Sequence, residues 1–208
     1  MQEIVVVKNK MREITYFSFL LAFEIFFCFT PLGSIPIGPI VATLAMLPVI
    51  LSGILFSKRF GLIMGFLAGL FSFLVWTFMP PMPAIAFIFT PFYNFGEING
   101  SIFSLIICFV PRILTGLFTS LSFDLFEKSF LRKKKYLNII LSSIIGSLTN
   151  TFGVLGLIFL FFGQQYENIM GKPILVILST VILTNGIPEA IVSAAVCVLV
   201  CRISKKIV

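Results

Sequence analysis

The chain is poor in charge. Only 11% of its 208 residues are charged, 59% are hydrophobic, and the mean hydropathy is +1.12. In a soluble domain about a quarter of the residues are charged. A chain of this composition cannot cover its apolar surface in water, so it is predicted to be an integral membrane protein.

Histidine is absent altogether. Its absence excludes the usual intramembrane proteases that need a Ser–His pair or a His-ligated metal. The chain also has no G-x-x-x-x-G-K-[ST] phosphate loop, so it does not hydrolyse ATP by that route. The four cysteines lie in apolar runs, where they are expected to act as small hydrophobic residues. We expect no metal, no cofactor and no enzymatic activity.

Hydrophobic segments, by contrast, fill the chain. They predict an all-α bundle of six transmembrane helices that forms a single domain over residues 1–208. The segment after residue 30, "PLGSIPIG", has no A-x-A cleavage pattern, so the first helix is expected to be retained. The six predicted helices cover residues 14–30, 40–56, 60–78, 101–123, 137–162 and 174–201.

Basic residues are placed asymmetrically between these helices. All but two of the 15 Lys and Arg residues lie before the first helix, in the 57–59 and 128–135 connections, or at the C-terminal end. With six crossings, these four regions share one side, which predicts that both termini are cytoplasmic. The expected location is the plasma membrane of a prokaryote. The basic residues form no single patch, so we expect no nucleic-acid partner.

The connections on the opposite side are unusual in composition. Residues 31–39, "PLGSIPIGP", are rich in Pro and Gly and are expected to be non-helical. Residues 79–100 combine four prolines with five aromatic residues, which predicts a loop packed over the outer face of the bundle. An interfacial segment without a role in ligand binding is an equally good interpretation.

Small residues predict two helix-packing surfaces. Gly61, Gly65 and Gly69 are spaced four apart, which lets another helix approach closely. The spacing does not say whether that helix belongs to this chain or to a partner. Ser18 and Ala22 form a weaker pair of the same kind in the first segment.

Ionisable and amide side chains occur inside the predicted helices, where they are costly and usually functional or paired. Five of them lie at similar depth and predict one interior cluster: Glu24, Arg112, Asn150, Asn185 and Glu189. Two interpretations remain open. The cluster either locks the bundle, with Arg112 paired to Glu24 or Glu189, or it binds a ligand.

The stretch "TNGIPEAI" predicts a break in the last helix. Pro188 has no backbone N–H to give to the carbonyl of Thr184, and Gly186 adds flexibility. A broken membrane helix is tolerated where it faces protein or a water-filled cavity, so the break favours a cavity near Asn185.

From about residue 14 to 202 the chain resembles the substrate-binding S components of energy-coupling factor (ECF) vitamin transporters. The stretches that carry the resemblance are "PLGSIPIGPIVATLAMLPVILSGILFSKRFGLIMGFLAGLFSFL", "PRILTGL", "GSLTNTFGVLGLIFL" and "TNGIPEAIVSAAV". The last two look most similar to the pantothenate-type branch, with the riboflavin, cobalamin and folate types next. The resemblance implies a membrane protein that captures a vitamin at the outer face and delivers it inward. Its implied partners are a transmembrane coupling subunit and two ATPase subunits.

The resemblance and the interior cluster together indicate site residues. Asn150, Asn185 and Arg112 are expected to bind the vitamin, with Glu189 orienting one of them. Phe92, Tyr93 and Asn94 are expected to form a lid, and Ser18 with Ala22, together with the glycine strip, to dock the coupling subunit. Two other functions stay open: a structural or assembly subunit of a membrane complex, and an autonomous secondary transporter.

Overall fold

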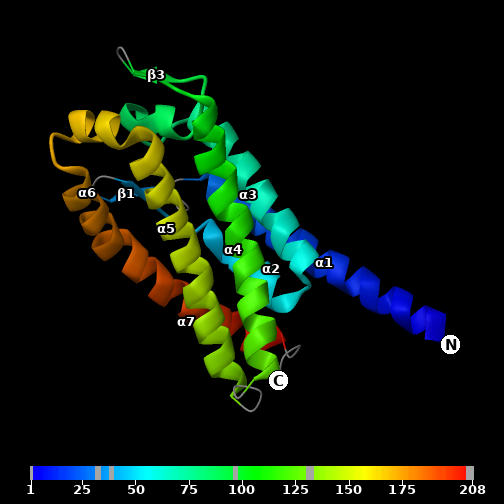
Figure 1. The fold of residues 1–208 in the computed structure, drawn as a ribbon. Coiled ribbons are helices and arrows are strands. Elements are labelled where there is room, and N and C mark those ends of the chain that lie inside the picture. Colours follow the sequence, from blue (N-terminus) through cyan, green and yellow to red (C-terminus); the bar gives the residue numbers. More distant parts are fainter. Residues whose placement is uncertain (1, 31–33, 38–39, 96–97, 130–133, 205–208) are drawn as a thin grey trace.

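Helices dominate the computed structural model, which describes residues 2–30, 34–37, 40–95, 98–129 and 134–204 (Figure 1). Two short antiparallel hairpins, β1 with β2 and β3 with β4, join the helices. In chain order the elements are α1 (Gln2–Phe29), β1 (Ser34–Ile37), β2 (Ile40–Thr43), α2 (Met46–Leu55), α3 (Lys58–Phe78), the 3-10 helix η1 (Pro83–Ile88), β3 (Asn94–Phe95), β4 (Ile98–Asn99), α4 (Ile102–Lys128), α5 (Lys135–Met170), α6 (Ile174–Val181), the π-helical turn η3 (Ile182–Gly186) and α7 (Ile187–Ser204).

Each predicted segment contains a helix, but the second is much shorter than expected. Residues 40–43 belong to β2, so the prediction of a helix over 40–56 was wrong in its first part. The 10 residues of α2 span about 15 Å, half of the roughly 30 Å of a bilayer core. All residues from Met46 to Ile54 are buried, so protein rather than lipid surrounds α2.

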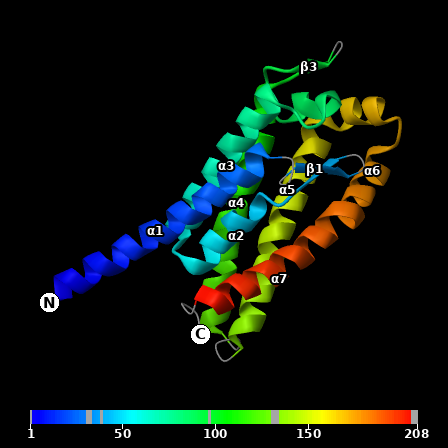
Figure 2. The ribbon, with the colours of Figure 1, turned by 180° about the vertical axis from the view of Figure 1, so that it is seen from behind.

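Among the described residues, four helical stretches are long and apolar enough to cross a membrane. They are α3, α4, α5 and the continuous stretch Ile174–Ser204, which joins α6, η3 and α7. The N-terminal half of α1 extends away from the bundle (Figures 1 and 2).

The bundle has two distinct ends. The end of α4, the start of α5 and the C-terminal end of α7 lie together, while β3, η1 and the turn from α5 to α6 lie at the opposite end (Figures 1 and 2). Lys128 and Lys135 therefore share one end, and Lys172 lies at the other. Four of the basic residues behind the topology prediction lie outside the described residues: Arg132, Lys133, Lys205 and Lys206.

The glycine strip of α3 packs against α4 of the same chain. A Cβ at Gly61 would lie 2.7 Å from the carbonyl oxygen of Gly116. A Cβ at Gly65 would overlap the carbonyl oxygen of Arg112, and one at Gly69 would lie 2.9 Å from the Phe109 ring. The flat surface that these glycines create is therefore occupied by α4 of the same chain.

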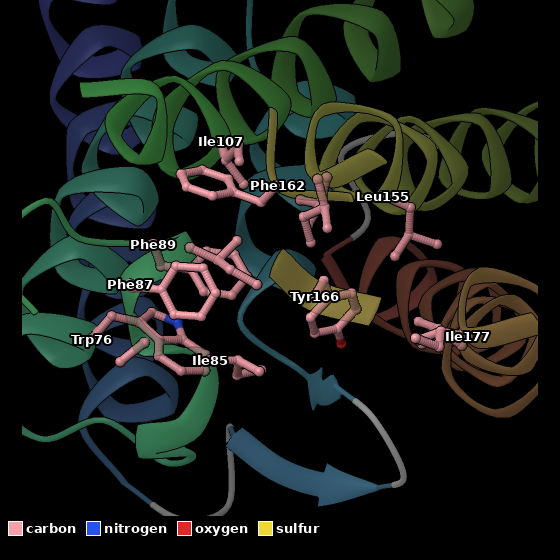
Figure 3. Packing of buried hydrophobic residues seen from close by; sticks show 14 of the residues in the cluster. Trp76, Ile85, Phe87, Phe89, Ile107, Leu155, Phe162, Tyr166 and Ile177 are labelled. Carbon is pink, nitrogen blue, oxygen red and sulfur yellow. The ribbon is translucent and has the colours of Figure 1, made fainter. Parts of the chain in front are cut away.

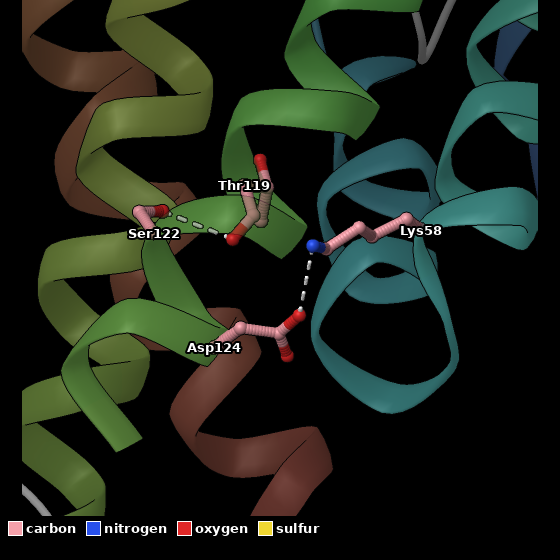
Figure 4. Close-up of polar contacts among 4 residues, drawn as sticks. All are labelled: Lys58, Thr119, Ser122 and Asp124. Carbon is pink, nitrogen blue, oxygen red and sulfur yellow. Dashed lines mark hydrogen bonds and ion pairs between the residues drawn. The ribbon is translucent and has the colours of Figure 1, made fainter. Parts of the chain in front are cut away.

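A polar contact also links α3 to α4 near the basic end of the bundle. Lys58 Nζ of α3 lies 3.6 Å from Asp124 Oδ2 of α4 (Figure 4). Within α4, Ser122 Oγ donates to the carbonyl of Thr119 at 2.9 Å. Both charged side chains are close to half exposed, so this ion pair adds little to stability. The close backbone packing of the two helices is the stronger contact.

Two apolar clusters make up the interior. The η1 cluster lies at the end of the bundle that contains β3 and η1, and it includes Trp76, Ile85, Phe87, Phe89 and Tyr166 (Figure 3). The α2 cluster includes Leu20, Met46, Ile50, Met64 and Cys197. The polar residues predicted to form one interior group lie between these two clusters.

Candidate functional site

A cavity lies at the junction of the two apolar clusters. Trp76, Phe89 and Leu155 of the η1 cluster line it, as do Met46 and Ala68 of the α2 cluster. Its volume of about 80 Å³ is room for several water molecules. Each of the helices α1 to α7 contributes to the wall, and so does the π-helical turn η3.

Arg112 lies in this wall, 7% exposed, and is held by its own helix. Its Nη1 donates to the carbonyl of Cys108 at 2.6 Å and to that of Ile107 at 3.4 Å, and its Nη2 donates to Ser72 Oγ at 2.9 Å. The Ile107 carbonyl is available because Pro111, four positions on, has no N–H to give it.

Part of the Arg112 guanidinium has no hydrogen-bond partner among the described groups. Its Nε is buried and makes no hydrogen bond to any described residue. Of the five N–H groups of a guanidinium, Nε–H and one hydrogen on Nη2 remain after the contacts above. Two such donors on one planar group suit the two oxygens of a carboxylate.

Neither carboxyl group inside the bundle, that of Glu24 or that of Glu189, pairs directly with Arg112. In the described part of the chain no ion pair joins it to Glu24 or Glu189, although its charge interacts with both over a longer distance. Glu189 lines the cavity. Glu24 is fully buried beside it, where Cys28 Sγ donates to its Oε1 at 3.3 Å. The interpretation of the cluster as a lock built on a direct Arg–Glu pair is therefore not supported.

Asn150 and Asn185 reach the cavity from neighbouring helices, α5 and the π-helical turn η3. Asn150 is 9% exposed, and its Oδ1 has no hydrogen-bond partner among the described groups. Four of the five residues in the predicted cluster thus line one cavity: Arg112, Asn150, Asn185 and Glu189.

The predicted break in the last helix takes the form of η3. The N–H of Ile187 bonds to the carbonyl of Ile182, five residues back, as in a π-helix. In an α-helix, side chains four positions apart point in directions that differ by about 40° around the helix axis. The wider π turn makes this difference smaller, so such side chains stay on one face. Val181, Asn185 and Glu189 therefore all face the cavity.

The predicted lid residues lie away from the cavity. Phe92 is 74% exposed, Asn94 is exposed in β3, and Tyr93 packs against the η1 cluster. Phe89, from the same connection, lines the cavity instead, and its ring stacks on that of Trp76 with centroids 4.5 Å apart. Two hydrogen bonds hold this segment: Ser104 Oγ donates to the Phe87 carbonyl at 2.6 Å, and Thr77 Oγ1 donates to Thr90 Oγ1 at 2.8 Å.

Sequence reasoning missed three of these residues. Ser72 orients Arg112, and Trp76 and Phe89 form the cover. Trp76 is the chain's single tryptophan, and Ser72 is a lone hydroxyl in the apolar run "AGLFSFLVW". Both features are visible in the sequence, but only the packing of α3 on α4 connects Ser72 with Arg112.

Ser18 and Ala22 lie on an exposed face of α1. Large apolar side chains surround them on this face, including Phe19, which is 64% exposed, and Phe23, which is 43% exposed. Unlike the glycine strip of α3, this pair of small residues has no helix of the described chain packed against it.

The fold and the cavity agree with a comparison against known families. A family model described as "ECF transporter, substrate-specific component" matches residues 12–201. The chain belongs to this family of multi-pass membrane proteins, and the resemblance noted in the sequence is confirmed. It is 32% identical over 156 residues to the "Pantothenic acid transporter PanT" of Lactococcus lactis subsp. cremoris (strain MG1363), an alignment that covers 74% of this chain and 73% of that protein.

Proposed function

We propose that this chain is the S component of an ECF importer and that it captures pantothenate at the outer face of a prokaryotic plasma membrane. The observation that carries this proposal is the cavity in which Arg112 presents unused N–H donors. The relative named as a pantothenic acid transporter supports the choice among vitamins.

The groups of pantothenate match the polar lining. Its carboxylate accepts from the free donors of Arg112, as a charge-assisted bidentate contact. Its amide and two hydroxyl groups bond to Asn150 and Asn185, since an amide side chain both donates and accepts. Its gem-dimethyl group packs against Trp76 and Phe89.

The proposed topology has six membrane crossings and cytoplasmic termini, with the hairpins at the outer face. The basic residues at one end of the bundle support this orientation. The partners are a transmembrane coupling subunit and two ATPase subunits. The exposed face around Ser18 and Ala22 is the proposed docking surface for the coupling subunit, because small residues permit close helix contact.

The test is ligand-dependent thermal stabilisation of the purified protein. Pantothenate is titrated beside riboflavin, folate and cobalamin under identical conditions. Saturable binding at one hundred times Kd stabilises the folded state by about 2.7 kcal/mol, so pantothenate is expected to raise the melting temperature in a dose-dependent way. A response to another vitamin but not to pantothenate overturns the substrate, and no response to any of them overturns the vitamin-binding function.

A further inference from the structure

The number of charges around the cavity sets a condition on its ligand. Arg112 is close enough to interact with two acidic side chains there, Glu24 and Glu189. Arg112 is one cation beside two carboxyl groups. If an anionic ligand binds to Arg112, both carboxyl groups lose the charge that best compensates them, and buried charges are costly unless they are paired.

The surroundings offer no second cation. The remaining wall consists of neutral side chains, with Met46 from α2, Ser72 from α3 and Asn150 from α5. α1 contributes the thiol of Cys28, which already donates to Glu24. No Lys, and no Arg besides Arg112, lines the cavity in the part of the chain that the structure describes.

Glu189 is the carboxyl group that a ligand would meet. It lines the cavity, and its Oε1 is buried without a hydrogen-bond partner among the described groups. Glu24 does not line the cavity, and Cys28 of the same helix, which does, is bonded to it. Two negative charges, one on Glu189 and one on a bound carboxylate, would repel each other in a site screened from bulk water.

We propose that binding of an anionic vitamin is coupled to uptake of one proton by Glu189. This proposal rests on the proposed function and adds a second ion to it. Glu189 takes the proton from solvent as the ligand carboxylate binds Arg112. The neutral acid then donates its O–H to an oxygen of the ligand. The charge of Arg112 balances that of the ligand carboxylate, and Glu189 adds no negative charge.

The test is calorimetric titration of the purified full-length protein with pantothenate in buffers of different ionisation enthalpy. The range is about pH 6 to pH 8.5, in which a simple carboxylic acid such as the ligand stays ionised. In the part of this range where Glu189 is ionised in the free protein, we expect close to one proton taken up per pantothenate and a Kd that rises about tenfold per pH unit. The neutral alcohol analogue, with CH2OH in place of the carboxylate, should bind without proton uptake.

Two isosteric variants assign the proton. Glu189→Gln should bind pantothenate with no proton uptake and with a Kd that does not change with pH. Glu24→Gln removes the other carboxyl group and should leave the proton count as in the wild type. If Glu189→Gln does not fold, as judged by its melting curve, the wild-type proton count still decides the coupling.

The outcomes separate the two proposals. Binding of pantothenate without proton uptake at every pH from about 6 to 8.5 overturns the coupling and leaves the proposed function standing. Proton uptake that persists in Glu189→Gln, or an affinity that follows the Na⁺ concentration instead of pH, overturns the role of Glu189. Absence of pantothenate binding in the wild type overturns the proposed substrate, and the coupling falls with it.

Discussion

At the scale of single residues, the contact between α3 and α4 depends on Gly65. A Cβ there would overlap the Arg112 carbonyl oxygen and lie 2.8 Å from Ile113 Cα, so Gly65→Ala must push the helices apart. We expect a loss of about 1–3 kcal/mol in the free energy of unfolding, measured as a melting temperature several degrees lower. Gly156→Ala is the matched control: its Cβ meets nothing within 4 Å, so it should leave stability unchanged or raise it by up to about 1 kcal/mol. Equal losses in both variants would contradict the packing argument.

A second residue-scale prediction concerns Asn185. Asn185→Ala removes one amide from the cavity wall and should weaken pantothenate binding by about 0.5–1.5 kcal/mol, roughly 2- to 13-fold in Kd. Thr184→Ala is its control, because Thr184 is exposed and its hydroxyl donates back to the Thr180 carbonyl of its own helix at 2.9 Å. Parallel loss of folding and binding in Asn185→Ala would indicate a structural lock instead.

At the scale of elements, the segment that contains η1 and Phe89 covers the cavity, and the hairpin β3–β4 does not. Phe89→Leu keeps an apolar side chain but removes the stacking on Trp76, worth about 0.5–1.5 kcal/mol. We expect dissociation of the vitamin to become several-fold faster, measured by chase with unlabelled ligand. Phe92→Leu, in the same connection but 74% exposed, should leave the dissociation rate unchanged. Faster release from Phe92→Leu would restore the lid expected from the sequence.

At the scale of the whole molecule, the positions of basic residues predict which end faces the cytoplasm. The four native cysteines are buried, so a new surface cysteine can be labelled selectively. Lys172→Cys, in the turn between α5 and α6, should react with a membrane-impermeant maleimide on intact cells. Lys134→Cys, before α5, should react only after the membrane is opened. The reverse pattern would show an inverted orientation. Labelling of both on intact cells would contradict the single crossing by α5 that separates the two positions.

The sequence by itself determined the membrane class, the approximate place of each helix and the set of polar residues that lie inside. These follow from local composition and from the cost of polar groups in lipid, which act on each stretch of chain independently. Pro188 and Gly186 also predicted an irregularity in the last helix, which is the π-helical turn η3. A missing N–H can be read from the sequence in this way because its effect stays within one turn.

Only the tertiary structure decided how these parts meet. It turned the glycine strip toward α4, shortened the second helix to 10 residues beside a hairpin, and brought Ser72 to Arg112, 40 positions away. It also replaced the expected cover of Phe92, Tyr93 and Asn94 with Phe89. The physical reason is that such contacts depend on the shapes of two surfaces distant in sequence, and local pattern constrains each surface without saying which one it will meet.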